Sequence, residues 1–449
     1  MGLPPLSALL QEDGDLPGRS RRLAWRRRSV GPGSAGRPTT LFSARSSKPC
    51  SRLDIPSQTT STATAGEGFA RFDRNVHRGR RLSAARAYLH PVRHRKNLTV
   101  ETMAMATRVR FRGTRAVGVD YLRGGRLRRT VAAGEIVLCG GAINTPQLLQ
   151  LSGVGDRALL AQHGIDVVHH SPGVGENLRD HLEVYIQYAS KQPVSIAPGL
   201  RWRMRPKIAV DWLFFRRRLG ATNHFEGGGF ARSNEDVDYP NLMFHFLPIA
   251  IRYDGTAPTK GHGYECTSDL CTPTPAGTCA SARPIRGNTP RCCSTTSRPR
   301  PIAGEWVEAV RVARDILNQP AFEPYNDGEL SPGPSVETDR EILDWVARDA
   351  ETALHPSCTA KMGLDEMSVV DPASMSVHGL EGLRVVDASV FPYVTNGNIY
   401  APVMMVAEKA ADLIAGNTPL PPAEVPYYRY RDGTPLYPPG DSRNHEEHP

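Results

Sequence analysis

The chain has 449 residues with a formal net charge of +9, and 39% of its residues are hydrophobic. That length suits two or three domains rather than one core, and the 41 glycines and 38 prolines predict many turns and irregular segments. The sequence predicts no membrane-spanning helix, coiled coil or repeat array, because it has no run of about 18 apolar residues and no recurring period.

The first segment, residues 1–65, is rich in Arg, Ser, Pro and Thr and shows no helical or strand period. Residues 1–66 hold ten basic side chains against four acidic ones, so much of the positive charge lies here. Such a composition buries too little apolar surface to offset the entropy of ordering, which predicts a disordered basic segment. A nucleic-acid patch, an anionic-membrane patch and a targeting peptide are the alternatives. Glu12, Asp13 and Asp15 argue against a targeting peptide.

Residues 66–262 and 302–416 have the composition of folded chain. In the first stretch, the alternation of residue types at 107–121 predicts a β-hairpin around a Gly-Thr turn. In the second stretch, the apolar spacing predicts amphipathic helices at 306–317 and 341–350.

A strand–turn–helix unit is predicted in the first stretch. The apolar run at 135–139 predicts a buried strand that ends at a Gly-Gly pair. Asn144 or Thr145 is then expected to cap a helix that has Pro146 at its first position.

A second such unit is predicted near the C-terminus. Residues 383–386 read as a strand, and after a loop Pro402 is expected to open a helix that Gly416 closes. Helix N-termini offer unpaired N–H groups and partial positive charge, so two units of this kind are suited to a bound dinucleotide. Simple α/β packing is the alternative.

Residues 265–300 resemble the first segment in composition. Five of the eight cysteines lie here among Thr, Pro, Arg and Ser, and apolar residues are scarce. The spacing contains no C-x2-C pair and no partnered His, so neither a zinc site nor a disulfide framework is predicted. The other cysteines are scattered, which is typical of a reduced cytosolic protein.

Five motifs, in order along the chain, resemble the glucose-methanol-choline (GMC) oxidoreductases. They are residues 141–155 (GAINTPQLLQLSGVG), 172–181 (PGVGENLRDH), 355–363 (HPSCTAKMG), 383–389 and 401–414. The first is long and restrictive and looks like the second signature of the family. Residues 191–195 and 223–230 (NHFEGGGF) are similar to the choline dehydrogenase subgroup. Together the resemblance covers about two thirds of the chain.

The resemblance implies an α/β (α+β) flavoprotein with a Rossmann-like FAD-binding domain and an antiparallel-sheet substrate-binding domain. Residues 66–182 and 355–420 would belong to the FAD domain. Residues 183–354 would form the substrate domain, with 265–300 as an anomalous stretch inside it, and 421–449 would be a tail.

The chemistry of the family also fits the residues. Oxidising an alcohol removes the hydroxyl proton as a hydride leaves the carbon, and histidine is suited to take that proton near neutral pH. His355 occupies the position of the family's catalytic histidine. The family's Gly-Asn-x-Asn element reads here as Gly-Asn-Ile-Tyr, so the resemblance implies Asn398 and Tyr400 as its catalytic partners.

Further residues carry over from the motifs. The expected cofactor contacts are Ala106, Gly141, Ala142, Asp387 and Ala388. A quaternary ammonium such as that of choline has no N–H, so its recognition requires aromatic faces and a carboxylate. Glu226, flanked by Phe225, resembles the family's ammonium partner.

Two segments depart from the family. The family begins with a strand, a G-x-G-x-x-G turn and a helix that hold the pyrophosphate. Residues 31–36 (GPGSAG) match that turn in letters, but neither a strand before it nor a helix after it is predicted. We therefore expect an FAD domain whose phosphate-binding part is missing or replaced. A shifted reading frame over residues 1–65 and 265–300 is one hypothesis for both departures.

Function is thus predicted as FAD-dependent, choline dehydrogenase-like alcohol oxidation. The alternatives are a truncated, inactive family member, another GMC alcohol dehydrogenase, and a basic nucleic-acid-binding protein. Only the N-terminal arginines support the last of these. The subgroup implies choline as substrate, a respiratory electron acceptor, no nucleic acid and no metal. It implies a cytoplasmic location, with peripheral association at the inner face of the cell membrane left open.

Overall fold

The structure is a computed structural model that describes residues 68–225, 227–234, 237, 239–252, 254–259, 261–271, 278–280, 291–293, 300–418 and 420. The predictions made for residues 1–65 and 421–449, and for Glu226, lie outside the described residues.

One half of the molecule is built on a seven-stranded antiparallel sheet with the order β1-β11-β12-β13-β10-β16, in which β17 also pairs with β10. The strands are β1 (Gly68–Arg71), β10 (Leu182–Ser190), β11 (Gly227–Ala231), β12 (Leu242–Leu247), β13 (Gly263–Leu270), β16 (Asn326–Ser331) and β17 (Glu351–Thr352). This is the antiparallel sheet expected for the substrate domain. Its edge strand β1, however, comes from the stretch that the sequence assigned to the FAD domain.

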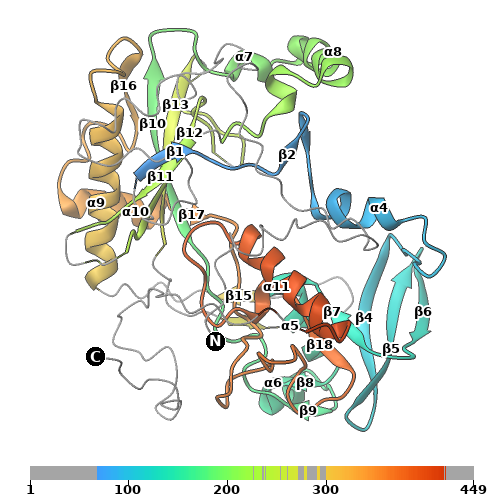
Figure 1. Ribbon diagram of the computed structural model, residues 1–449. Helices are drawn as coiled ribbons and strands as arrows, with labels where there is room; N and C mark the ends of the chain where they lie inside the picture. Colours follow the sequence, from blue (N-terminus) through green and yellow to red (C-terminus); the bar gives the residue numbers. More distant parts are fainter. Residues whose placement is uncertain are drawn as a thin grey trace.

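Two amphipathic helices cover one face of this sheet, α9 (Arg300–Leu317) and α10 (Asp339–Asp349) (Figure 1). Their apolar faces pack on the sheet, where Ile316, Ile342 and Phe244 are almost completely buried. Thr338 caps α10 by accepting from the Glu341 N–H while the Glu341 carboxylate accepts from the Thr338 N–H, a reciprocal cap that fixes the start of the helix. Both predicted helices are thereby confirmed.

Strand β13 differs from the expectation for residues 265–300. Its eight residues are all buried, and it pairs with β12 on one side and β10 on the other, at the centre of the sheet. Glu265, Thr267, Ser268 and Asp269 are therefore buried polar side chains in a central strand. Ser268 Oγ and Asp269 Oδ1 have no hydrogen-bond partner in the part of the chain that the structure describes. Burying polar atoms in this way is costly.

The other half contains a three-stranded antiparallel sheet and a parallel strand pair. The first consists of β4 (Ala104–Arg112), β5 (Arg115–Arg123) and β6 (Arg126–Val131), and the second of β7 (Ile136–Leu138) and β18 (Leu383–Val385). Helices α5 (Gly141–Leu151) and α11 (Tyr400–Ile414) follow the parallel strands, and a second core of buried aliphatic residues joins them. The predicted hairpin and both predicted strands are confirmed.

The predicted start of α5 is wrong. The helix begins at Gly141 rather than after Asn144 or Thr145, and Pro146 lies inside it. The contact that stabilises the start of the helix comes from a distant residue. The Asp387 carboxylate accepts from the Gly141 N–H at 2.9 Å, across a separation of 246 residues. Similarly, α11 begins at Tyr400, two residues before Pro402. Gly416 follows its C-cap with a φ of +68°, as expected for a helix-ending glycine.

Shorter elements connect these parts. They are β2 (Val76–His77), β3 (Arg80–Arg81), the π-helical turn η1 (Ala85–Leu89), α4 (His90–Val92), β8 (Val154–Gly155), α6 (Arg157–Gln162), β9 (His169–His170), α7 (Ala197–Leu200), η2 (Trp202–Met204), α8 (Arg205–Phe215), η3 (Arg218–Ala221), β14 (Thr278–Ala280), β15 (Arg291–Cys293) and η4 (Ala388–Val390). Within the described ranges, no helix is long and apolar enough to cross a bilayer.

Candidate active site

The loop that carries His355 lies along the end of the parallel strand pair. The Cys358 N–H donates to the Ala388 carbonyl at 3.1 Å, and the Ala360 N–H donates to the Ser389 carbonyl at 2.8 Å. At the start of the loop, the His355 N–H donates to Asp180 Oδ1 at 2.9 Å. These backbone contacts bring a histidine from one part of the chain to the ends of β7 and β18.

The His355 imidazole is held on both of its nitrogens. Asn398 Nδ2 lies 3.2 Å from His355 Nε2, and His181 Nδ1 lies 3.1 Å from His355 Nδ1. An amide nitrogen only donates, so this geometry assigns the lone pair to His355 Nε2 and the proton to Nδ1. The side chain is 8% exposed, and burial lowers its pKa to about 4. His355 is therefore neutral at pH 7, with Nε2 able to accept a proton.

Two further histidines complete the cluster. Burial lowers the pKa of His181 to about 3, and the neighbouring His355 contributes to that shift. Burial also lowers the pKa of His245, on β12, to about 4, although a hydrogen bond with Asn398 acts in the opposite direction. The Asn398 amide thus links His355 to His245. His245 Nδ1 lies 3.4 Å from Asp269 Oδ2.

Aromatic rings lie beside this cluster. The Phe72 and Phe225 rings meet the His245 ring edge-on, with centroid distances of 5.2 Å and 5.8 Å. Phe225, which the sequence predicts as a substrate contact, therefore lies next to His245. These rings give the cluster an apolar wall.

Tyr400 is exposed, as Asn398 is, but the two residues differ in their contacts with His355. Tyr400 is the first residue of α11 and is 39% exposed. Among the described residues, the hydrogen bond to His355 Nε2 comes from Asn398. The preceding Gly397 has a φ of +72°, and a Cβ there would lie 3.2 Å from the Phe230 ring, so the turn that presents Asn398 favours glycine.

Four of the five predicted cofactor residues lie together at the ends of the parallel strands. Asp387 Oδ2 accepts from the Gly141 N–H at 2.9 Å and from Thr145 Oγ1 at 2.6 Å, while its Oδ1 accepts from the Ser389 N–H at 2.8 Å. Ala142 and Ala388 are the buried neighbours of these groups. Ala106 lies apart from them on β4, where it is exposed and pairs with Tyr121.

Thr359 connects the histidine loop to helix α5. Its Oγ1 donates to the Ala142 carbonyl at 2.6 Å, and the side chain is completely buried. In an α-helix that carbonyl would accept from the N–H four residues later, but position 146 is a proline and has none. The hydroxyl of Thr359 therefore satisfies an acceptor that Pro146 leaves open.

His181, His245 and Thr359 were missed by sequence reasoning. His181 and Thr359 stand inside motifs that resemble the family, so their places in those motifs were the available signal. His245 stands in the apolar strand LMFHFL, where a lone histidine is ambiguous between core and site. Its neighbours come from distant parts of the chain.

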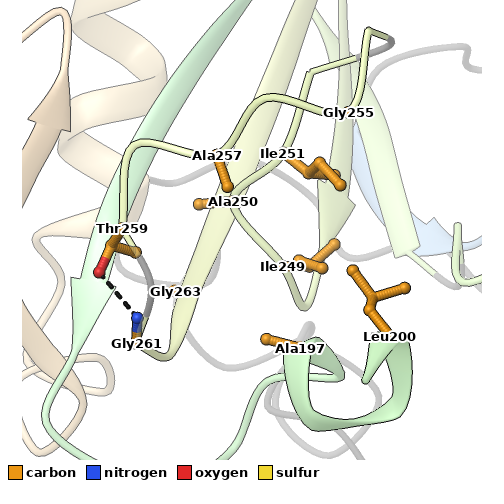
Figure 2. A pocket seen from close by; sticks show the side chains of 10 residues that line it. All are labelled: Ala197, Leu200, Ile249, Ala250, Ile251, Gly255, Ala257, Thr259, Gly261 and Gly263. Carbon is orange, nitrogen blue, oxygen red and sulfur yellow. Dashed lines mark hydrogen bonds between the residues drawn. The ribbon is translucent and has the colours of Figure 1, made fainter. Parts of the chain in front are cut away.

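A cavity of about 150 Å³ lies elsewhere, between α7 and the loop that joins β12 to β13. Figure 2 shows it lined by small and aliphatic residues, among them Ala197, Leu200 and Ile249, and at one side Thr259 Oγ1 accepts from the Gly261 N–H. None of the described residues that line it has a titratable side chain. It therefore lacks the chemistry of the histidine cluster.

Known proteins resemble this chain in sequence. The family models described as GMC oxidoreductase match residues 36–183 and 297–407. The oxygen-dependent choline dehydrogenase of Staphylococcus aureus (strains JH9 and Newman) is 56% identical over 366 residues, which are 81% of this chain and 64% of the relative. The chain thus spans 64% of the length of these curated relatives.

Solved structures resemble it in fold. Pyridoxine 4-oxidase from Mesorbium loti superposes with a TM-score of 0.71 at 27% identity, over 82% of this chain and 68% of that chain. Formate oxidase from Aspergillus oryzae RIB40, in a variant concerned with FAD modification, has a TM-score of 0.78 at 22% identity, over 85% of this chain and 71% of that chain. The second likeness concerns the fold alone.

Proposed function

This chain belongs to the GMC oxidoreductase family, and on that premise we propose that it is an FAD-dependent enzyme that oxidises choline to betaine aldehyde. The observation that carries the proposal is the contact between the buried His355 imidazole and the Asn398 amide, in a chain that is 56% identical to a choline dehydrogenase. A neutral imidazole next to an amide donor suits the removal of a hydroxyl proton.

The residues at the strand ends fit the flavin part of FAD. Gly141 has a φ of +81°, and a Cβ built on it would find no atom within 4 Å, so open space adjoins the backbone at the start of α5. A helix N-terminus favours an electron-rich or anionic group. Gly141, Ala142, Asp387 and Ala388 would hold the flavin there. Bound FAD would supply the acceptor for the hydride. Ala106 remains a separate proposal for an adenine contact.

The chain's own residues would handle the proton and the oxygen. The alcohol hydroxyl would lie beside His355 Nε2 and Asn398 Nδ2, within hydrogen-bonding distance of both, and these two atoms are 3.2 Å apart. His355 Nε2 would accept the hydroxyl proton, and the Asn398 amide would donate to the oxygen as it gains negative charge. His181 would keep His355 oriented through its Nδ1. Tyr400 is proposed as a second donor at the oxygen.

The trimethylammonium group of choline needs a different environment. Phe72 and Phe225 present rings beside His245 and would contact the methyl groups through cation–π attraction. We propose the Glu226 carboxylate as the counter-charge, on the basis of its place next to Phe225 in the sequence.

The electron acceptor is a proposal of its own. The subgroup resemblance implies a respiratory acceptor at a membrane, whereas the name of the Staphylococcus aureus relatives specifies oxygen. We propose the respiratory acceptor, together with a cytoplasmic location at the inner face of the membrane. Choline oxidation that accelerates with a soluble quinone would support it. Oxygen uptake that accounts for all turnover, with no gain from quinone, would contradict it.

Absorbance of the purified, FAD-loaded chain tests the proposed function. Under anaerobic conditions, choline is expected to bleach the flavin band, and ethanol and benzyl alcohol are expected to leave it unchanged. Faster bleaching by another alcohol would favour a different GMC alcohol dehydrogenase. A chain that retains no FAD, or that retains FAD and is not bleached by any alcohol, would contradict the proposal.

A further inference from the structure

The segment formed by α7, η2 and α8 carries an unusual set of exposed apolar side chains. They are Leu200, Trp202, Val210, Leu213, Phe214 and Phe215, whose exposed fractions run from 49% to 75%. Within the described part of the chain, the exposed Trp and Phe side chains all lie in this segment. Large apolar groups gathered on a surface indicate an interaction site. We call these six residues the apolar tip.

The apolar tip points away from the body of the molecule. On the inner side of α8, Trp212 Nε1 donates to the Gly79 carbonyl at 2.8 Å, which fixes that side against the turn between β2 and β3. Phe214 lies two residues further on, roughly 200° around the helix. It is 75% exposed. Figure 1 shows α7 and α8 at the far side of the sheet from α9 and α10, at the rim of the molecule.

Basic side chains surround the apolar tip. Residues 200–218 contain seven of them and a single acid: Arg201, Arg203, Arg205, Lys207, Arg216, Arg217 and Arg218, against Asp211. Asp211 already pairs with Arg217 at 3.2 Å and with Arg218 at 3.5 Å. Two guanidinium groups lie over exposed rings, Arg203 over Trp202 at 5.4 Å and Arg217 over Phe215 at 4.5 Å. The whole segment is therefore both apolar and strongly cationic.

We propose that this segment docks the protein on an anionic lipid surface. Aromatic and aliphatic side chains would enter the interface between headgroups and acyl chains, while the arginines and the lysine remain at the level of the anionic headgroups. Long basic side chains suit that arrangement because their stems are apolar and their heads are charged. The proposed attachment is peripheral, through side chains at the surface of this segment.

Charge argues against a second copy of the chain as the occupant. A symmetric contact would place seven basic side chains opposite the same seven, with no free acid to offset them. A nucleic acid would match the charge, but half of the apolar tip is aliphatic, and Leu200, Val210 and Leu213 offer no ring for bases to stack on. The proposal rests on the proposed location at the inner face of the membrane and names the surface that would make the contact. It is independent of the alcohol chemistry, because no proposed site residue lies on this surface.

Sedimentation with vesicles tests the proposal on the full chain. Vesicles that contain phosphatidylglycerol are expected to bind it at low salt, and vesicles of phosphatidylcholine alone to bind it at least about tenfold more weakly. Phe214→Ser is expected to weaken binding about tenfold, and Arg205→Gln roughly fivefold. Leu364→Ser, at an apolar residue that is also 75% exposed, and Arg128→Gln, at an exposed arginine, are the matched controls and should bind as the parent does.

Four results would overturn the proposal. The first is absence of binding to phosphatidylglycerol vesicles at low salt. The second is equal weakening by Phe214→Ser and Leu364→Ser. The third is a dimer in analytical ultracentrifugation that Phe214→Ser dissociates. The fourth is retention on single-stranded DNA without retention on vesicles. Circular dichroism of each variant shows that it is folded, so that loss of binding is read as loss of the surface.

Discussion

At the scale of single residues, His355 shows what a motif predicts and what it does not. The motif at 355–363 and the Gly-Asn pair predicted His355 and Asn398 as partners, because each motif can be recognised from a few consecutive residues. The two other histidines of the cluster come from 174 residues before His355 and from the middle of an apolar strand, so only the fold reveals them. Tyr400, which the resemblance implies as a second partner, begins α11 and is 39% exposed, and its role stays a prediction.

The lowered pKa of His355 leads to a prediction about pH. Burial lowers that pKa to about 4, so the imidazole stays neutral and able to accept a proton well below pH 6.5. The rate of flavin reduction by choline is therefore expected to stay level from about pH 8 down to about pH 5 and to fall through about pH 4 as the imidazole becomes charged. Rapid mixing at a series of pH values measures this. A fall centred near pH 6.5 would show an imidazole with ordinary solvation and contradict the site geometry.

At the scale of elements, α5 shows why the residues next to a helix did not predict where the helix begins. Asn144 and Thr145 have the chemistry of N-caps, but Asp387 supplies the capping oxygen from the end of the neighbouring strand. The expectation for residues 265–300 failed for a related reason. Pairing of β13 with β12 and β10 places polar residues in the centre of a sheet. In both cases tertiary pairing decided the outcome and local propensity did not. The hairpin and the strands β7 and β18 were predictable because their patterns are complete within a few residues.

The contact between Thr359 and Ala142 gives a prediction for a double-mutant cycle. Thr359→Val removes the hydroxyl and leaves the Ala142 carbonyl buried without a donor, because Pro146 has no N–H. The free energy of unfolding is expected to fall by about 1–3 kcal/mol. In a Pro146→Ala background the new N–H replaces the hydroxyl, so Thr359→Val should cost much less there.

Urea unfolding of the four chains measures this coupling, with Thr359→Ser as the control that keeps the hydroxyl. An equal cost of Thr359→Val in both backgrounds would mean that the threonine acts by packing and not through the carbonyl that Pro146 leaves open.

At the scale of the whole molecule, stability depends on carboxyl groups buried in β13. Glu265 is 1% exposed, and burial raises its pKa to about 8, although Gln187 Nε2 and the Ile251 N–H both donate to its Oε2. Burial also raises the pKa of Asp269. Buried carboxyl groups are unfavourable in a central strand. A shifted reading frame over residues 265–300, as hypothesised from the sequence, would introduce residues of this unsuited kind.

Glu265 therefore predicts a specific dependence of stability on pH. The folded chain holds this proton more tightly than the unfolded chain, whose pKa is about 4.5. The free energy of unfolding contributed by Glu265 is therefore highest below about pH 4.5 and is lost as the pH rises towards about 8, by up to about 1.4 kcal/mol per pH unit. Glu265→Gln should raise the stability at pH 8 relative to the parent chain, and the difference should shrink towards pH 4.5.

Denaturant unfolding at several pH values measures this difference. Glu408→Gln, at an exposed residue of α11, is the matched control and should leave the pH dependence unchanged. A constant difference between Glu265→Gln and the parent at every pH would show that Glu265 keeps an ordinary pKa in the folded chain.

The central claim is that His355 takes the hydroxyl proton while a flavin held at the ends of β7 and β18 accepts the hydride. The most direct measurement is the rate of flavin bleaching after anaerobic mixing of choline with the FAD-loaded chain, its His355→Gln variant and the control His94→Gln, at an exposed histidine. We expect His355→Gln to retain FAD and to be bleached roughly 10²–10⁴-fold more slowly, with the control unchanged. Equal bleaching rates in the parent and in flavin-loaded His355→Gln would contradict the account.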